Sequence, residues 1–469
     1  MNHTAIFRVL SLSGFLLGLA MVVPLGVALI LGESQQVLAF GLSALLTLVI
    51  ASMVYLLIGK SDRNARVNDA LTAAVLWCFG APIPAALPFV IGTAEPTFIA
   101  AFHEAVSCLT TTGHSVIDLD GNAWPVSLLV WRGVLHFIGM IFSLTLAATI
   151  FAALGFAGPG IHRSYLFTVP EGDFFDAIPR AFRTIFIICG SLTLFIFSVL
   201  ILNGADPFTA LSLGISVAST GLVDPNGYAG FTGGPIVFIG LFVGLFLATA
   251  GLPLLMNLRP RNLLRAEIDP ELYLLIGLIF TLTGLAIYGG MSLFPAFGWA
   301  LSSLSTSGMP MGTPIDELRS SLPLSLLILP ALIGGAALST AGGIKLARII
   351  ILIRRAGQEF ARLGFHNSVV ALKFKDRHQK ESAVLGVWVY LIAYIAAISA
   401  LFVVLSFLDL DFASAIAQSV GAVSNSGWLI DAQQNASSFY HATLSFGMIL
   451  GRLEVLALIP VLNFAFWRR

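Results

Sequence analysis

Charged side chains are scarce in this sequence. Of its 469 residues only 10% are Asp, Glu, Lys or Arg, whereas 57% are hydrophobic; soluble domains carry about 25% charged residues. The formal net charge is zero, which by itself says little, and we expect no nucleic-acid partner. This composition excludes an ordinary soluble protein and predicts a helical integral membrane protein.

Residues that usually catalyse reactions or hold metals are also few. The three cysteines, Cys78, Cys108 and Cys189, are isolated in apolar surroundings, which argues against a disulfide framework and against a zinc site. The chain has no Walker motif, no GxGxxG motif following a strand and no visible catalytic constellation. We therefore expect no enzyme activity and no organic cofactor in this chain.

Long apolar runs account for most of the sequence. The first, from Val9 to about Gly32, is too long for a signal peptide and has no clear cleavage site, so we interpret it as a retained helix. Runs of spanning length cover residues 9–32, 37–59, 70–92, 126–155, 182–202, 235–257, 271–290, 323–351, 384–408 and 440–465. The sequence therefore predicts an all-α, multi-pass integral membrane protein with about ten transmembrane helices.

Basic residues are distributed unevenly among the loops that join these runs. With the N-terminus in the cytoplasm, the cytoplasmic side receives Lys60, Arg63, Arg66, Arg163, Arg180, Arg183, Arg259, Arg261, Arg265, nine residues between 345 and 380, Arg468 and Arg469. Arg319 is alone on the outer side, while Arg132 and Arg452 fall within spans. Because cytoplasmic loops are enriched in Lys and Arg, this bias predicts that both termini are cytoplasmic.

Four segments between the spans are too short to cross a membrane, yet they are Ala/Ser-rich and helical in character. They read TFIAAFHEAVSCLTTTGH, PFTALSLGISVASTGL, FPAFGWALSSLSTSGM and FASAIAQSVGAVSNSGW. Their glycine-ending turns are Thr111-Thr112-Gly113, Ser219-Thr220-Gly221, Thr306-Ser307-Gly308 and Asn425-Ser426-Gly427. This recurrence predicts a fourfold repeat of helix, re-entrant half-helix and helix.

The repeat defines the expected domains. Residues 1–66 form an N-terminal extension of two helices, and the four pore repeats occupy 67–157, 158–258, 259–380 and 381–469. We expect the third repeat to include an unwound intramembrane segment and a basic cytoplasmic segment as well.

All four turns fall on the outer side in this topology, where non-helical backbone is tolerated only if it is buried or lines a water-filled path. One Ser/Thr-Gly turn would be an ordinary surface turn, but four at matching places favour convergence on one axis. Helix C-termini facing that axis favour a cation, and glycine lets successive carbonyls point the same way. Because carbonyl rings replace the hydration shell of K⁺ in channels, we predict that these twelve residues form a cation filter.

Several motifs resemble those of a known family. FHEAVSCLTTTGHSVI is similar to a first pore loop, LVWRGVLHFIGM to the helix after it, GGAALSTAGGIKLARIIIL to a glycine-rich break in the third repeat, and GRLEVLALIPVL to an arginine-bearing last helix. Together they resemble the TrkH/TrkG/KtrB superfamily of bacterial potassium transporters, most closely the TrkH branch, over essentially the whole chain. The resemblance implies potassium uptake across the bacterial inner membrane, a homodimer, and a cytosolic nucleotide-binding regulatory subunit of the TrkA type.

A glycine-rich segment interrupts the span in the third repeat. Its residues of interest are Gly334, Gly335, Ser339, Thr340, Gly342, Gly343 and Lys345. Glycines in membrane helices often serve close helix packing, but four in ten residues favour an unwound segment. The resemblance implies that this segment is a gate below the filter.

Intramembrane arginines offer further candidates, because a charge within the membrane usually faces a cavity or a partner. Glu454 lies roughly opposite Arg452 on a helix and is a poor partner for it. Arg452 either pairs with a distant carboxylate such as Glu104 or, as the resemblance implies, forms a barrier in the permeation path; we favour the barrier. Arg132 lies at the outer end of its helix, where a long side chain can snorkel, so we expect its role to be structural. His114 either titrates at the filter mouth or packs through hydrogen bonds.

Partners and substrate range leave alternatives open. The basic stretch from Arg354 to Lys380 is a topology signal, a contact for anionic membrane lipid or, as the resemblance implies, a docking surface for a cytosolic ring. A weakly selective Na⁺/K⁺ pathway and a secondary carrier of an organic solute also compete with potassium uptake. Such carriers usually show inverted repeats, whereas the repeats here run parallel.

Overall fold

The computed structural model describes residues 2–58, 67–93, 97–117, 124–148, 174–224, 234–257, 269–312, 319, 321–364, 373–374, 377–378, 381–408, 410–431 and 436–455. Within these residues nearly all regular structure is α-helical. The exceptions are a 3₁₀ turn, η3 (Gly427–Leu429), and two short antiparallel strands, β1 (Lys373–Phe374) and β2 (Arg377–His378). The all-α membrane fold class is confirmed.

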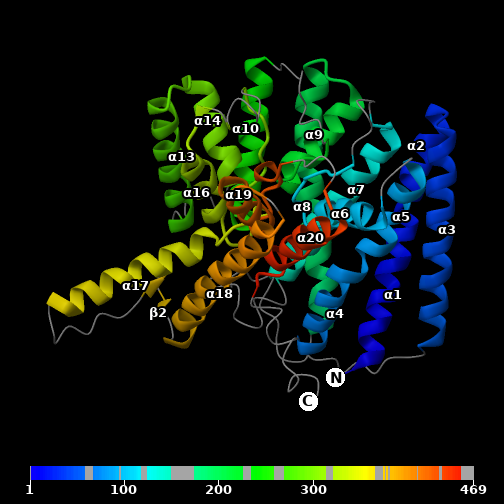
Figure 1. Ribbon diagram of the computed structural model, residues 1–469, viewed down its shortest axis with the longest axis horizontal. Helices are drawn as coiled ribbons and strands as arrows, with labels where there is room; N and C mark the ends of the chain where they lie inside the picture. Colours follow the sequence, from blue (N-terminus) through cyan, green and yellow to red (C-terminus); the bar gives the residue numbers. More distant parts are fainter. Residues whose placement is uncertain are drawn as a thin grey trace.

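The N-terminal extension lies along one edge of the molecule (Figure 1). It consists of α1 (His3–Ala20), α2 (Val22–Leu31) and α3 (Ser34–Leu57). α1 and α2 form one span with an interruption at Met21, because Pro24 has no N–H to continue the helical hydrogen bonds. Large apolar side chains on this edge are exposed, such as Ile30 (84%) and Leu56 (79%), as expected for a surface that faces lipid.

Each of the four repeats begins with a long helix and continues with a short one. The long helices are α4 (Val67–Gly80) with α5 (Pro82–Gly92), α8 (Phe174–Leu202), α13 (Pro270–Tyr288) and α18 (Glu381–Ser406). The short helices are α6 (Phe98–Leu109), α9 (Pro207–Ser219), α14 (Leu293–Leu304) and α19 (Phe412–Val423). Side chains of Thr97, Asp206 and Asp411 accept backbone N–H groups at the starts of α6, α9 and α19, which explains why these helices begin there.

The second membrane helices are less regular than the sequence predicts. They are α7 (Val126–Leu146), α10 (Pro235–Ala250) with α11 (Leu252–Asn257), α16 (Leu324–Ile333) with α17 (Leu346–Gly364), and α20 (Ser438–Arg452). Seven helices among the described residues are long and apolar enough to span a membrane. They account for seven of the ten predicted spans.

The predictions of one continuous helix at 235–257 and at 440–465 are wrong, whereas the span at 323–351 is interrupted, as its glycines predict. α10 ends at Gly251 (φ 81°), α16 ends at Gly334 (φ 73°), and α20 ends at Arg452, shortly before Glu454 at φ 53°. A residue in the left-handed region terminates a helix, so the second helix of repeats two, three and four breaks at a corresponding place. Residues 149–155 and 456–465 of the predicted spans lie outside the described residues.

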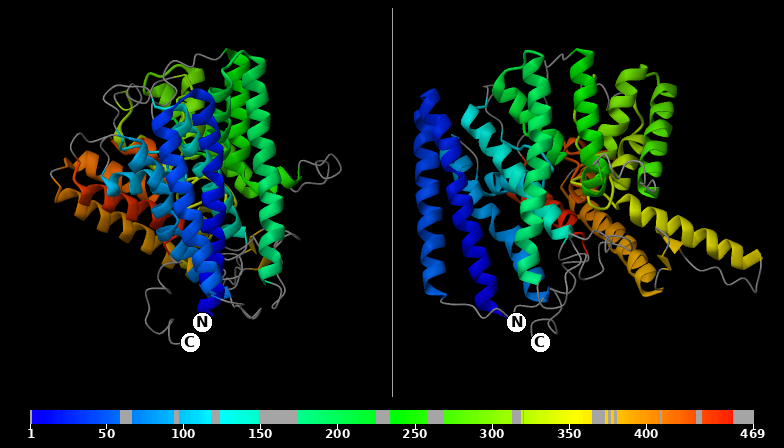
Figure 2. Two further views of the ribbon diagram at one scale, coloured as in Figure 1. Left: turned by 90° about the vertical axis from the view of Figure 1, so that its right-hand side faces the viewer. Right: turned by 180° about the vertical axis from the view of Figure 1, so that it is seen from behind.

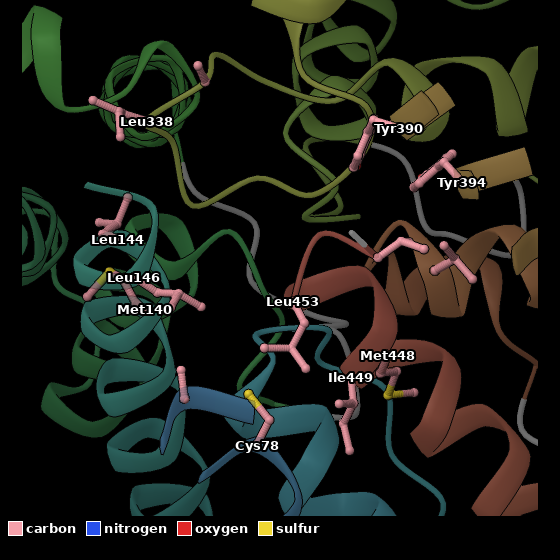
Figure 3. Close-up of a cluster of buried hydrophobic side chains, with 14 of the residues drawn as sticks. Cys78, Met140, Leu144, Leu146, Leu338, Tyr390, Tyr394, Met448, Ile449 and Leu453 are labelled. Carbon is pink, nitrogen blue, oxygen red and sulfur yellow. The ribbon is translucent and has the colours of Figure 1, made fainter. Parts of the chain in front are cut away.

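Below the short helices, the four repeats share one hydrophobic cluster. Figure 3 shows Leu338, from the unwound segment after α16, near Leu144 of α7, with Ile449 of α20 and Leu453 directly after it in the same cluster. Cys78 of α4 also belongs to it. By contrast, α17 projects away from the body of the molecule in Figure 1 and in the right-hand view of Figure 2. Apolar packing therefore joins the repeats at the level where the second helices break.

Candidate ion pathway and gate

The four short helices end in turns with the same unusual backbone conformation. Thr111 (φ 53°), Thr220 (54°), Thr306 (61°) and Asn425 (55°) are all left-handed. Such a conformation is uncommon for residues other than glycine. The described chain contains three more non-glycine residues with positive φ, Lys345, Glu454 and Val455, and these lie in the unwound segment or directly after Arg452. Backbone strain is therefore concentrated in the turns and just below them, as is typical of functional sites.

A conserved hydrogen bond aligns the four turns residue by residue. In each, the carbonyl four residues before the left-handed residue accepts the backbone N–H of the residue that follows it. The pairs are Thr112 N to Ser107 O (2.8 Å), Gly221 N to Ser216 O (3.2 Å), Ser307 N to Ser302 O (3.2 Å) and Ser426 N to Gly421 O (2.7 Å). Gly221 thus corresponds to Thr112, and the equivalents of Gly113 are Leu222, Gly308 and Gly427.

This alignment differs from the sequence-based one in the second repeat. The sequence pattern matched Ser219-Thr220-Gly221 with Thr111-Thr112-Gly113, but the structure matches it with residues 110–112. The reason is that both triplets consist of small polar residues followed by glycine, so their letters do not reveal a shift of one residue.

The structure brings the turns together backbone to backbone. Gly427 donates its N–H to Thr112 O (3.1 Å), and Asn425 Nδ2 donates to Thr112 Oγ1 (3.1 Å), which joins the first and fourth turns. A Cβ added to Gly221 would clash with Thr111 O, and one added to Gly308 would clash with Trp428. Glycine is therefore required at these positions because neighbouring turns approach so closely.

A buried ion pair supports the first two turns. Arg132 and Glu104 are bonded to each other, and both side chains are 0% exposed. Arg132 Nε also donates to Val223 O (2.6 Å), while Ser115 Oγ (3.0 Å) and Val116 N (3.1 Å) donate to Glu104. Arg132 does not snorkel, because backbone carbonyls and a carboxylate satisfy its guanidinium inside the protein; this burial agrees with the structural role expected from the sequence. The sequence signal for this role was the arginine within a span.

His114 packs inward, which agrees with its hydrogen-bonded alternative. Its Nδ1 lies 3.1 Å from His103 Nε2, and its carbonyl accepts a hydrogen bond from Ser107 Oγ (2.6 Å). His103 Nδ1 in turn lies 3.1 Å from His441 O and from Ser445 Oγ on α20. These contacts connect the first turn to the last helix.

Beneath the turns lies the unwound segment between α16 and α17, residues 334–345, here called the gate loop. Ala336 N donates to Thr249 O (3.0 Å) and Leu252 N to Leu338 O (2.9 Å), so the gate loop is bonded to the break between α10 and α11. Ala337 N donates to the Glu271 carboxylate (2.9 Å).

The gate loop also reaches the filter. Gly342 N donates to Thr306 Oγ1 of the third turn (2.9 Å), and a Cβ on Gly342 would clash with Ser424 O, just before the fourth turn. Lys345 Nζ folds back onto the gate loop and donates to Ser339 O (3.1 Å). The glycines therefore serve an unwound, buried segment rather than helix packing; its role as a gate stays a prediction.

Arg452 joins the first turn to the gate loop. Its Nε donates to Thr110 O (2.8 Å), its Nη1 to Thr340 O (3.0 Å), and its Nη2 to Thr111 Oγ1. The alternative in which Arg452 pairs with Glu104 is wrong, since Glu104 is bonded to Arg132. The guanidinium charge therefore lies at the level between the turns and the gate loop.

Glu454 does not pair with Arg452, for which the helix geometry made it a poor partner. It forms an ion pair with Arg348 of α17, and the Arg348 guanidinium lies 4.0 Å from the centroid of the Tyr390 ring on α18. This pair ties the end of α20 to the start of α17, just beyond the gate loop.

Known transport proteins are similar to this chain in sequence and in fold. Residues 287–465 match the TrkH family model, described as a cation transport protein. Over their full lengths, the chain is 28% identical to the Trk system potassium uptake protein TrkH of Escherichia coli K12 and 27% identical to TrkG of the same organism. The fold matches the crystal structure of the potassium transporter TrkH from Vibrio parahaemolyticus over 100% of both chains, with a TM-score of 0.86 and 24% sequence identity.

Proposed function

Because this chain belongs to the TrkH family of cation transporters, we propose that it takes up potassium ions across the bacterial inner membrane through the centre of its four turns. It is a transport protein and not an enzyme. The observation that carries this proposal is the convergence of four equivalent left-handed turns, one from each repeat, into direct contact. The proposed domains are those of the repeat, 1–66, 67–157, 158–258, 259–380 and 381–469.

Potassium, as the substrate, would be bound by the twelve filter residues predicted from the sequence. Each turn follows the C-terminus of a short helix, and helix C-termini carry partial negative charge that favours a cation. Backbone carbonyls are suitable ligands because they can replace the hydration shell of K⁺. No charged filter side chain is needed for such a site.

The gate loop and Arg452 would control passage below the filter. A guanidinium in a low-dielectric interior repels an approaching cation strongly, and Arg452 is hydrogen-bonded to both the first turn and the gate loop. Conduction would require the gate loop to withdraw, which breaks the bond between Arg452 and Thr340. Closed and open states then differ by a small set of named hydrogen bonds.

A flux assay tests potassium uptake. In vesicles reconstituted with the purified protein, we expect uptake driven by K⁺ and Rb⁺ gradients to exceed uptake driven by Na⁺. Gly308→Ser should reduce the K⁺/Na⁺ flux ratio, since Gly308 has φ 66° and its added Cβ would clash with Trp428. Gly277→Ser is the matched control, because Gly277 has nothing within 4 Å of an added Cβ. Equal flux ratios in the two variants would contradict the filter assignment.

Regulation from the cytoplasm is part of the proposal. A homodimer with cytoplasmic termini would present α17 to a cytosolic nucleotide-binding ring of the TrkA type, with anionic lipid as a neighbouring contact. A ring that binds open and closed states unequally would bias the gate loop. Arg354 of α17 is exposed, and Arg355 forms an exposed ion pair with Glu359 (2.9 Å). The Arg259–Arg265 loop, a second predicted contact, lies outside the described residues.

Charge removal on α17 tests this regulation. Neutralising Arg354 and Arg355 together should weaken binding of the ring, because charge pairs at an interface set the association rate and the orientation of the partners. Flux should then become insensitive to nucleotide. The K⁺/Na⁺ flux ratio should stay unchanged. Binding is measured by pull-down and flux in vesicles with and without the ring. Full nucleotide-independent uptake, with no cytosolic protein captured by the wild-type chain, would refute a regulatory ring.

A further inference from the structure

Leu222 occupies a position that is glycine in the other three repeats. The shared hydrogen bonds that align Thr112, Gly221, Ser307 and Ser426 make the following residues equivalent: Gly113, Leu222, Gly308 and Gly427. The four turns otherwise share their left-handed residue and their hydrogen bond. The second turn is therefore the one that departs from the pattern.

The departure restricts the backbone. Gly113 (φ 82°) and Gly308 (φ 66°) use the left-handed conformation at this position, whereas Leu222 does not. Gly427 does not use it either, but a glycine retains access to that conformation without a steric penalty. A leucine adopts it only at a steric cost, because its Cβ comes too close to the following carbonyl oxygen. Only the second turn thus lacks the freedom to rotate its carbonyl at this level.

The surroundings of Leu222 hold it in place. Its side chain is 6% exposed and belongs to the buried apolar cluster that also contains Val217 and Leu245. On the backbone side, Arg132 Nη2 lies 3.4 Å from Leu222 O and Arg132 Nε lies 2.6 Å from Val223 O. Arg132 Nη2 is also 3.4 Å from Gly113 O, but Gly113 has no side chain to anchor it. The second turn is therefore fixed from both sides.

We propose that Leu222 is a specificity-determining residue that lowers the discrimination of this filter between K⁺ and Na⁺. The inference rests on the proposed function, since it concerns the same filter. Selectivity for K⁺ depends on the number and orientation of coordinating carbonyls. A turn that cannot rotate its carbonyl toward the ion leaves this level of the filter incomplete, and a partly hydrated Na⁺ is then rejected less strongly.

Three substitutions at one position separate backbone freedom from side-chain size. Leu222→Gly restores the glycine of the other repeats. Leu222→Asn keeps a side chain of similar shape but tolerates the left-handed conformation, as Asn425 does in the fourth turn. Leu222→Ala shortens the side chain without granting that freedom. In vesicles, the ratio of Rb⁺ to ²²Na⁺ uptake should rise roughly threefold or more in the Gly variant and by a smaller factor in the Asn variant, because each restores one coordinating carbonyl.

The outcomes distinguish this inference from the proposed function. A ratio that rises in the Gly and Asn variants but not in the Ala variant supports it, and the Asn variant alone suffices if the Gly variant does not fold. An equal rise in all three variants would mean that side-chain bulk matters and would overturn it. An unchanged or reduced ratio in the Gly and Asn variants would also overturn it while leaving potassium uptake intact. If the wild-type chain carries no cation at all, both proposals fall together.

Discussion

The filter turns and the gate loop are both non-helical backbone buried within the membrane-spanning part of the protein, yet they are built differently. The turns occur four times, with one left-handed residue and one repeated hydrogen bond in each. The gate loop lies in the third repeat, and its side-chain partners are Glu271, Thr306 and Arg452, on three separate elements.

This difference indicates which part is rigid and which can move. Neighbouring turns are in direct contact, and the buried pair of Glu104 and Arg132 supports the first two. A shift of one turn would therefore disturb its neighbours. Apart from its two backbone bonds to the break between α10 and α11, the gate loop is held by individual side chains, and the loss of one of these leaves the other bonds in place. We therefore expect substitutions beneath the turns to affect stability and substitutions around the gate loop to affect flux.

The largest effect is expected for Glu104→Ala. It leaves Arg132 buried without a counter-charge, which costs about 3–5 kcal/mol for a buried pair. The control, Glu359→Ala, removes the exposed partner of Arg355, whose loss should cost at most about 0.5 kcal/mol. Thermal unfolding of the detergent-purified variants measures both. Similar melting temperatures would show that the buried pair does not hold the turns.

Arg452→Ala should raise cation flux without abolishing folding. The substitution removes a positive charge between the first turn and Thr340, and with it the barrier to a cation. Arg452→Lys keeps the charge but lacks the planar fork that reaches two carbonyls at once, so its flux should lie between that of the wild type and that of the Ala variant. Vesicle uptake and melting temperature are measured together. A folded Ala variant with wild-type flux would contradict the barrier.

The smallest of these effects is expected for Glu271→Ala, which removes one hydrogen bond from Ala337 of the gate loop. A hydrogen bond to a charged group contributes about 1.5–3 kcal/mol, so the closed gate loop should weaken and basal flux should rise less than in Arg452→Ala. Glu271→Gln keeps an acceptor oxygen, so basal flux should rise less in this variant than in Glu271→Ala. If the Gln variant equals or exceeds the Ala variant in flux, the charge of Glu271 acts by some route other than this bond.

Much of the architecture follows from the sequence. Low charge, long apolar runs and the four Ala/Ser-rich segments predict a helical membrane protein with a fourfold pore repeat, because a chain in lipid must satisfy its own backbone hydrogen bonds. The four glycines within residues 334–343 predict an unwound segment, which the structure contains. These features depend on local composition, so they can be read without knowing which helices are neighbours.

Other features depend on contacts between segments far apart in the chain, and only the tertiary structure decides them. Glu104 pairs with Arg132 of α7 rather than with Arg452 of α20, although α6 packs against both helices. Arg452 is satisfied by carbonyls of Thr110 and Thr340, groups that carry no signal in the sequence. Leu222 takes the glycine position of its turn because backbone hydrogen bonds set the alignment, whereas the Ser-Thr-Gly letters next to it suggest an alignment shifted by one residue.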